Sequence, residues 1–170
     1  MAFCLLCVQE LAEVLVIDFS ETEGIPKLDE DLPWQDQGQA TLSACSSLIT
    51  VVDFCDSPIV QFSHYSVKEF LILERLAASM VDLLRNHHIL LEPTHTTMAK
   101  ACIGMLLHLK KPIINETMKR LPLADYAAKH FANHTEFRNV ISHMTSAIDD
   151  LLDVDKPYFA LWISYISSSW

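Results

Sequence analysis

The stretch "VQFSHYSVKEFL", residues 60–71, marks the point where the chain changes from extended to helical structure. Residues 49–52 and 59–62 are runs of β-branched and aromatic side chains, and the segment between them is polar and contains Pro58. Two such runs around a polar connection are typical of a β-hairpin. We therefore predict a two-stranded ribbon that ends immediately before His64.

The second part of this stretch predicts a helix. Ser66 and Glu69 have the spacing of a capping box, in which the hydroxyl and the carboxylate each accept a backbone N–H at the start of a helix. We expect this helix to begin at Ser66 and to end gradually within residues 77–86. Its expected core side chains are Val67, Phe70, Leu71, Leu73 and Leu76.

His64 lies between the predicted ribbon and this helix. Free backbone N–H groups and the positive end of the helix dipole favour an anion at such a position, so main chain and imidazole together could hold a phosphate. Alternatively, the imidazole only forms hydrogen bonds to the ribbon and the helix. The residues alone leave both interpretations open.

Helical patterns flank the ribbon on both sides. Apolar spacing predicts a short helix within residues 10–19 and a second helix over residues 39–48, separated by an acidic loop over 20–38. The apolar residues 1–7 are interpreted as the last turn of a helix. Nine acidic residues lie between residues 10 and 36, and we expect them on a solvated loop and helix face.

The second half of the chain reads as all-α. We predict helices that begin at Thr94 or Thr96 and at Pro122, one over residues 137–152, and one over residues 158–166. The predicted fold is therefore mainly α with a small β-hairpin. It comprises a truncated winged helix in residues 1–80 and an α-helical bundle or helical-hairpin region in residues 81–170.

Composition limits the partners and the compartment. The net charge of −10, with only 12 Lys and Arg residues, argues against a nucleic-acid surface. No apolar run approaches the roughly 18 residues that a membrane span requires. The chain has five cysteines, an odd number, so we expect reduced thiols in a cytoplasmic protein. We interpret Cys4 and Cys7 as ordinary thiols despite their C-x-x-C spacing.

No catalytic motif is evident, and we predict that the chain is not an enzyme. Gly24, Gly38 and Gly104 are isolated glycines, whereas a phosphate-binding loop needs clustered glycines followed by Lys and Ser or Thr. No G-x-S-x-G nucleophile motif occurs.

The histidines also suggest no metal site. His130 and His134 have the spacing of a metal-binding pair, but Phe131 stands where a zinc protease needs its general-base Glu. We therefore expect these two side chains to be polar residues on a helix face. His87, His88 and His95 are expected around a loop and a helix start, where imidazoles are unremarkable.

Two motifs carry a family resemblance. Residues 42–50, "LSACSSLIT", and residues 60–71 resemble the winged-helix segment that follows the NACHT nucleotide-binding module in fungal STAND-type proteins. This segment is often labelled a GPI inositol-deacylase winged helix, although the label does not mean an esterase. Residues 8–18 and 122–130 resemble the helical regions on either side of it.

The resemblance implies a non-catalytic regulatory module that couples the nucleotide state of a NACHT domain to a sensor made of ankyrin or other repeats. In related receptors a histidine matching His64 touches the ADP phosphates and keeps the module closed. ADP or ATP would thus be a cofactor of the parent protein, and we expect none in this chain.

The sequence also departs from the family pattern. The phosphate-binding loop, the acidic Mg²⁺-binding strand and the first winged-helix helix are missing, so we expect a fragment or a truncated gene product. The alternatives are a free-standing helical adaptor that binds a protein partner, or a product without function.

Overall fold

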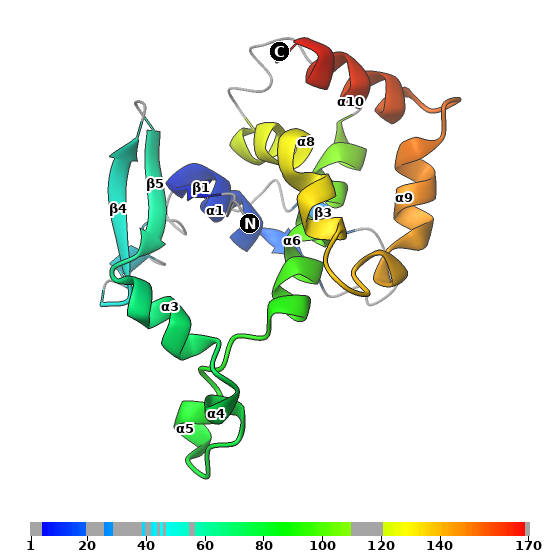
Figure 1. Cartoon of the computed structure of the whole chain (residues 1–170). Helices are drawn as coiled ribbons and strands as arrows, with labels where there is room; N and C mark the ends of the chain where they lie inside the picture. The colour runs from blue at the N-terminus through cyan, green and yellow to red at the C-terminus, as the bar shows by residue number, and fades with distance from the viewer. Residues whose placement is uncertain are drawn as a thin grey trace.

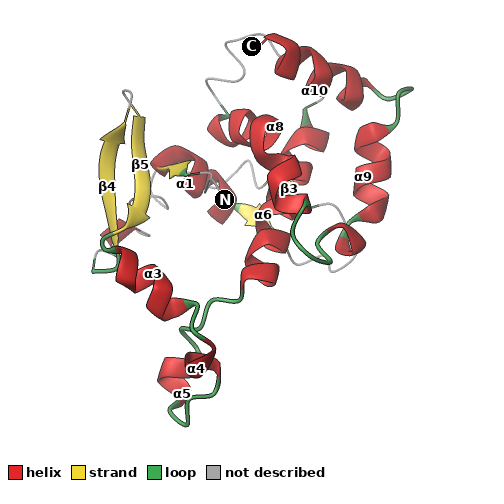
Figure 2. Cartoon of the chain, in the orientation of Figure 1, coloured by secondary structure: helices red, strands yellow, loops and turns green. Residues whose placement is uncertain are grey.

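The computed structural model describes residues 5–19, 26–28, 39, 42–43, 45, 47–54, 57–109 and 121–168. These residues are mainly helical and include a small antiparallel sheet, as the sequence predicts (Figures 1 and 2). The predicted loop over 20–38 lies outside the described residues except for 26–28. Of the helix predicted over 39–48, Gln39, Leu42 and Ser43 are helical.

The predicted ribbon is present. Strands β4 (Ile49–Phe54) and β5 (Ser57–Phe62) pair antiparallel, with Ile49 opposite Phe62 and Phe54 opposite Ser57. Both strands extend further toward their connection than expected, because Pro58 belongs to β5 and pairs with Asp53.

A short third strand corrects the interpretation of the first residues. Strand β1 (Leu6–Cys7) pairs with the other edge of β5, so the sheet order is β1, β5, β4. The expected helical turn is therefore wrong for Leu6 and Cys7. Their backbone is extended because β5 offers its free hydrogen-bonding edge at this point.

Helix α1 (Val8–Leu15) begins at a capping box that uses a thiol. The Sγ atom of Cys7 accepts from the Glu10 amide at 3.4 Å, and a Glu10 carboxylate oxygen accepts from the Cys7 amide at 2.6 Å. The helix ends earlier than predicted, since strand β2 (Ile17–Asp18) pairs with β3 (Lys27–Leu28).

The predicted long helix after the ribbon is three short ones. Helix α3 (Tyr65–Leu71) is followed by α4 (Glu74–Ala77) and α5 (Asp82–Arg85). The last two extend away from the other helices at the bottom of Figure 1. No residue of α5 is buried, so tertiary packing contributes little to it.

The main core lies between α6 (Leu91–His108) and α8 (Pro122–Thr135). Pro122 occupies the first turn of α8, as predicted. The remaining helices, α9 (Thr145–Leu152) and α10 (Pro157–Ser168), close this core, and the indole of Trp162 donates to the Ala128 carbonyl at 3.2 Å. Fully or almost fully buried members of the core are Ala99, Cys102, Ile103, Met105, Leu123, Ala127, Val140 and Leu151.

Two predicted boundaries in this half are wrong. Helix α6 begins at Leu91, so Thr94 and Thr96 lie inside it, and each hydroxyl donates to the carbonyl four residues earlier. The helix predicted over 137–152 starts only at Thr145, preceded by a 3-10 turn (Ile141–His143). Asn139 interrupts the helix because its φ of 62° is left-handed.

The first helix also belongs to this core. A Glu13 carboxylate oxygen accepts from the Leu123 amide at the start of α8 at 2.7 Å, and the Glu13 side chain is only 2% exposed. The interpretation of the acidic residues as a solvated face is therefore wrong for Glu13. Burial raises the pKa of Glu13 to about 7.

Candidate functional site

His64 is the N-cap of α3, and its backbone is extended, with φ −147° and ψ 145°. Its Nδ1 atom accepts from the Ser66 amide at 3.2 Å and lies 2.7 Å from the Ser66 hydroxyl. The predicted capping box of Ser66 and Glu69 is therefore wrong, because the helix begins one residue earlier and the imidazole caps it.

This cap determines what His64 can offer a ligand. Because Nδ1 accepts a backbone proton, the neutral ring carries its own proton on Nε2. The side chain is exposed, so Nε2–H is a hydrogen-bond donor at the surface. The Ser66 amide itself is already paired with the imidazole.

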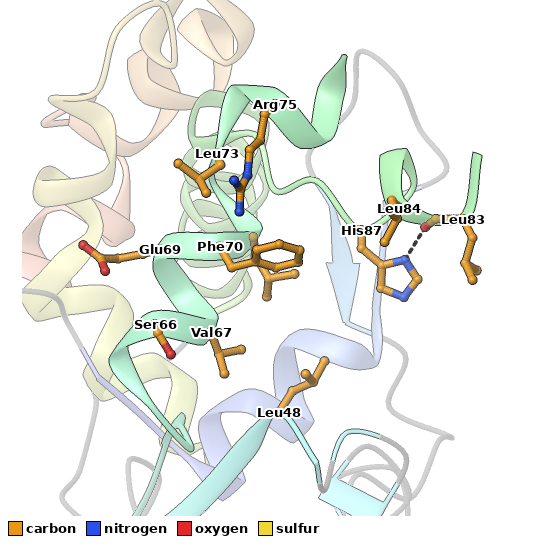
Figure 3. Close-up of a pocket in the computed structure, with 11 residues that line it drawn as sticks. Leu48, Ser66, Val67, Glu69, Phe70, Leu73, Arg75, Leu83, Leu84 and His87 are labelled. Carbon is orange, nitrogen blue, oxygen red and sulfur yellow. Dashed lines mark hydrogen bonds between the residues drawn. The ribbon is translucent and has the colours of Figure 1, made fainter. Parts of the chain in front are cut away.

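A groove beside this residue is lined by α3, α4 and α5 (Figure 3). Its volume is about 680 Å³, and its walls are mainly apolar. We call this surface the α3–α5 groove; it is lined by Leu48, Ser66, Val67, Glu69, Phe70, Leu71, Leu73, Arg75, Leu83, Leu84 and His87.

The groove exposes side chains that the sequence assigns to the core. Leu71 and Leu76 are buried as expected, but Phe70 is 41% and Leu73 40% exposed. In α5, Leu83 is 68% exposed. The expectation of a buried Phe70 and Leu73 is wrong because α4 and α5 turn away and do not cover them.

Polar groups surround this apolar centre. The Arg75 guanidinium lies 5.8 Å from the centre of the Phe70 ring, a cation–π contact. His87 contributes its Nδ1 to a 2.6 Å hydrogen bond with the Leu83 carbonyl, drawn as a dashed line in Figure 3. Aromatic and Arg side chains within an apolar patch are the composition of protein interfaces.

Of the two histidines with the spacing of a metal-binding pair, His134 differs from the expectation. His134 is 8% exposed, so the expectation of a polar residue on a helix face is wrong for it. Its Nδ1 lies 3.0 Å from Nδ1 of His95, and its Nε2 lies 2.8 Å from the Tyr126 hydroxyl. His130 is half-buried, with its ring 4.8 Å from that of Tyr126.

Burial favours the uncharged form of His134 and of His95. Desolvation, followed by the nearby His95 and His130, lowers the pKa of His134 to about 4, and burial also lowers the pKa of His95. Within the described parts of the chain, no three His, Cys, Asp or Glu side chains are arranged to hold a metal ion.

Sequence reasoning missed the contact between His95 and His134. The two residues are 39 positions apart and lie on α6 and α8, so no local spacing connects them. The only signal was the apolar face of each helix, which predicts that the two helices pack but not which polar atoms meet.

Comparisons with protein-family models, with curated proteins and with solved structures find no match to this chain. Across the described helices, none has both the length and the apolar character needed to cross a bilayer. Among the described cysteines, Cys7 and Cys45 are free thiols.

Proposed function

We propose that this chain is a non-catalytic regulatory module that binds another protein domain through the α3–α5 groove. In this proposal the ribbon and its flanking helices belong to the winged helix of a STAND-type signalling protein. The module couples the nucleotide state of a NACHT domain to a repeat sensor. The observation that carries the proposal is the apolar groove. It exposes Phe70 and Leu73, although their spacing in the sequence is typical of core residues.

The exposed apolar side chains favour a protein partner. Burying one Leu or Phe side chain completely contributes about 1.5–3 kcal/mol, and several such groups lie side by side in the groove. An apolar patch of this kind on one face is typical of an interaction surface. The Arg75 and Phe70 pair gives the surface the residue types common in binding hot spots.

The position of His64 favours a nucleotide-binding partner. Its exposed Nε2 and the groove belong to the same short helix, α3, whose length is about 10 Å. A domain that covers the groove would therefore reach the imidazole. The resemblance of residues 60–71 to the segment that contacts ADP in NACHT proteins supports the same partner.

The proposal is tested by calorimetry with a separately produced NACHT domain, loaded with ADP or with a non-hydrolysable ATP analogue. We expect micromolar binding to the ADP form and weaker binding to the ATP form. The double variant Leu83→Asp and Leu84→Asp should abolish binding. Val154→Asp, which places one carboxylate at an exposed position in the helical half, should not change it.

A second titration asks whether nucleotide binds this chain directly. We expect neither ADP nor ATP to bind the isolated chain appreciably, since His64 would be one contact of a site built mainly by the partner. Micromolar binding of either nucleotide would contradict the proposed division of roles.

The same groove supports the alternative of a free-standing helical adaptor. An adaptor would bind its protein partner with equal affinity whether or not nucleotide is present, and His64→Ala would not change that affinity. A truncated product without function would bind no partner through this surface.

A further inference from the structure

A second cavity lies where the sheet and α3 meet α6 and α8. It shares no lining residue with the α3–α5 groove, and its volume is about 670 Å³. Phe62 and Ile72 line it from one side, and Leu91, Met98 and Phe137 line it from the other. A mainly apolar cavity of this size, with a few polar groups, is typical of a small-molecule site.

The polar groups that line the cavity include the chain of His95, His134 and Tyr126. Each neighbouring pair in this chain is within hydrogen-bond distance, at 3.0 and 2.8 Å. His134 and Tyr126 are buried, and His95 is half-buried. The Phe137 ring stacks on His95 at 4.4 Å and thereby holds the imidazole in place.

His95 is the member of this chain with bonding capacity left for a ligand. It uses Nδ1 on His134, which leaves Nε2. If Nδ1 of His95 accepts a hydrogen bond from His134, Nε2 of His95 carries the proton and can donate to a ligand. If Nδ1 of His95 donates instead, Nε2 of His95 can accept from a ligand. The chain can therefore bond either a carbonyl or a hydroxyl group.

The charges around the cavity favour an uncharged ligand. Lys68 and Glu136 both line it and contribute one charge of each sign. The aromatic rings of Phe62, Tyr126 and Phe137 suit a flat apolar body. We propose that this cavity binds a neutral aromatic small molecule with one hydroxyl or carbonyl group, hydrogen-bonded to Nε2 of His95.

The test uses 6-propionyl-2-(dimethylamino)naphthalene, a neutral fluorophore with a single ketone, titrated with the whole chain. We expect saturable binding with a blue-shifted emission. Met98→Trp should fill the cavity and remove binding. His95→Phe keeps a ring against Phe137 but removes the hydrogen bond, and should weaken binding about tenfold.

The matched control is Phe70→Ser in the α3–α5 groove, which should bind the fluorophore as the wild type does. A loss of binding in this control would place the probe in the other groove and overturn the proposal. Circular dichroism must show that each variant is folded before its affinity is compared.

A second measurement needs no variant. 2-Naphthol and 2-naphthoate have the same ring body, and they compete with the fluorophore on the wild-type chain. We expect the naphthol to displace the fluorophore at a concentration at least tenfold lower, because the anion must be desolvated without a matching net positive charge. Absence of any fluorophore binding, or equal competition by the two compounds, would overturn the proposal.

Discussion

Glu13 shows how one residue connects the two halves of the chain. Its carboxylate accepts from the Leu123 amide, one of the unpaired donors at the start of α8. The side chain comes from α1, 110 positions earlier, and is almost completely buried. The interaction therefore fixes α1 against the helical core, with a titratable group at the contact.

We predict that Glu13 makes stability depend on pH. Its pKa rises from 4.5 to about 7 on folding, so its contribution is fully present below pH 4.5 and is lost as the pH rises to about 7. Glu13→Gln keeps an acceptor for the Leu123 amide but does not titrate. The unfolding free energy of this variant, relative to the wild type, should increase by about 3 kcal/mol between pH 4.5 and 7.

Urea denaturation at half-unit pH steps measures this difference. Glu13→Ala is the companion variant, which leaves the Leu123 amide without its acceptor and should be less stable by about 1–3 kcal/mol at pH 5. Parallel pH profiles for Glu13→Gln and the wild type would disprove the prediction.

Gly104, in α6, lies close to the backbone of Pro26. A Cβ atom at this position would lie 2.7 Å from the Pro26 carbonyl oxygen, which is backbone and cannot move aside easily. We predict that Gly104→Ala destabilises the protein by about 1–3 kcal/mol, despite a helix propensity about 1 kcal/mol better. Thermal unfolding measures this effect, with Thr97→Ala, an exposed change in the same helix, as the control. If the Gly104→Ala variant is more stable than the wild type, the Pro26 backbone moves to make room for the methyl group and the prediction is wrong.

At the scale of elements, α3, α4 and α5 differ from α8 in how much they bury. Each of α3 and α4 has one buried residue and α5 has none, whereas α8 has seven. The stability of short helices in water depends on such packing. The segment that carries the proposed binding surface is therefore the one held least firmly by the chain itself.

We predict that this difference is visible in hydrogen exchange. Amides of residues 82–86 should exchange far faster than those of residues 124–134, because opening α5 exposes no core. Exchange followed by mass spectrometry measures this, and addition of the proposed partner should slow exchange in 82–86 but not in 145–152. Equal protection of α5 and α8 in the free chain would contradict the prediction.

Helices α6 and α8 are coupled through their histidines. The pKa of His134 falls from 6.5 to about 4 on folding, so its contribution to stability is fully present above pH 6.5 and is lost as the pH falls through about 4. Protonation of both His95 and His134 would bring two N–H groups together at their 3.0 Å contact. Acid should therefore weaken the packing of α6 on α8.

We predict that His134→Phe loses the part of the stability that rises with pH, so its unfolding free energy, relative to the wild type, falls between pH 4 and 6.5. Its stability at pH 7 should also fall, by about 1–3 kcal/mol, since Tyr126 and His95 lose a partner. Tyr126→Phe is the matched control, because it removes one hydrogen bond and keeps the imidazole. If Tyr126→Phe shows the same relative fall with rising pH, the pH dependence does not come from His134.

At the scale of the whole molecule, the two buried groups have opposite effects. Between pH 4.5 and 6.5, stability from Glu13 falls with rising pH, whereas stability from His134 rises. The wild-type profile should therefore be flatter than the profile of either single variant. The two surfaces proposed for binding share no lining residue, so a protein partner in the groove and a small molecule in the cavity could bind together.

Local patterns in the sequence determined the elements whose backbone hydrogen bonds are local or between neighbouring segments. β-Branched runs around Pro58 predicted the β4 and β5 ribbon, and Pro122 predicted the start of α8, because these preferences act within a few residues. His64 was likewise marked at the start of α3 by the helix signal that follows it.

Only the tertiary structure decided which side chains those elements bury. Phe70 and Leu73 have the spacing of core residues but lie in an open groove, and Glu13 and His134 read as surface residues but are buried. The physical reason is that burial depends on contacts between segments far apart in the chain, as between Glu13 and Leu123. Sequence periodicity shows that a face is apolar, and the fold determines what covers it.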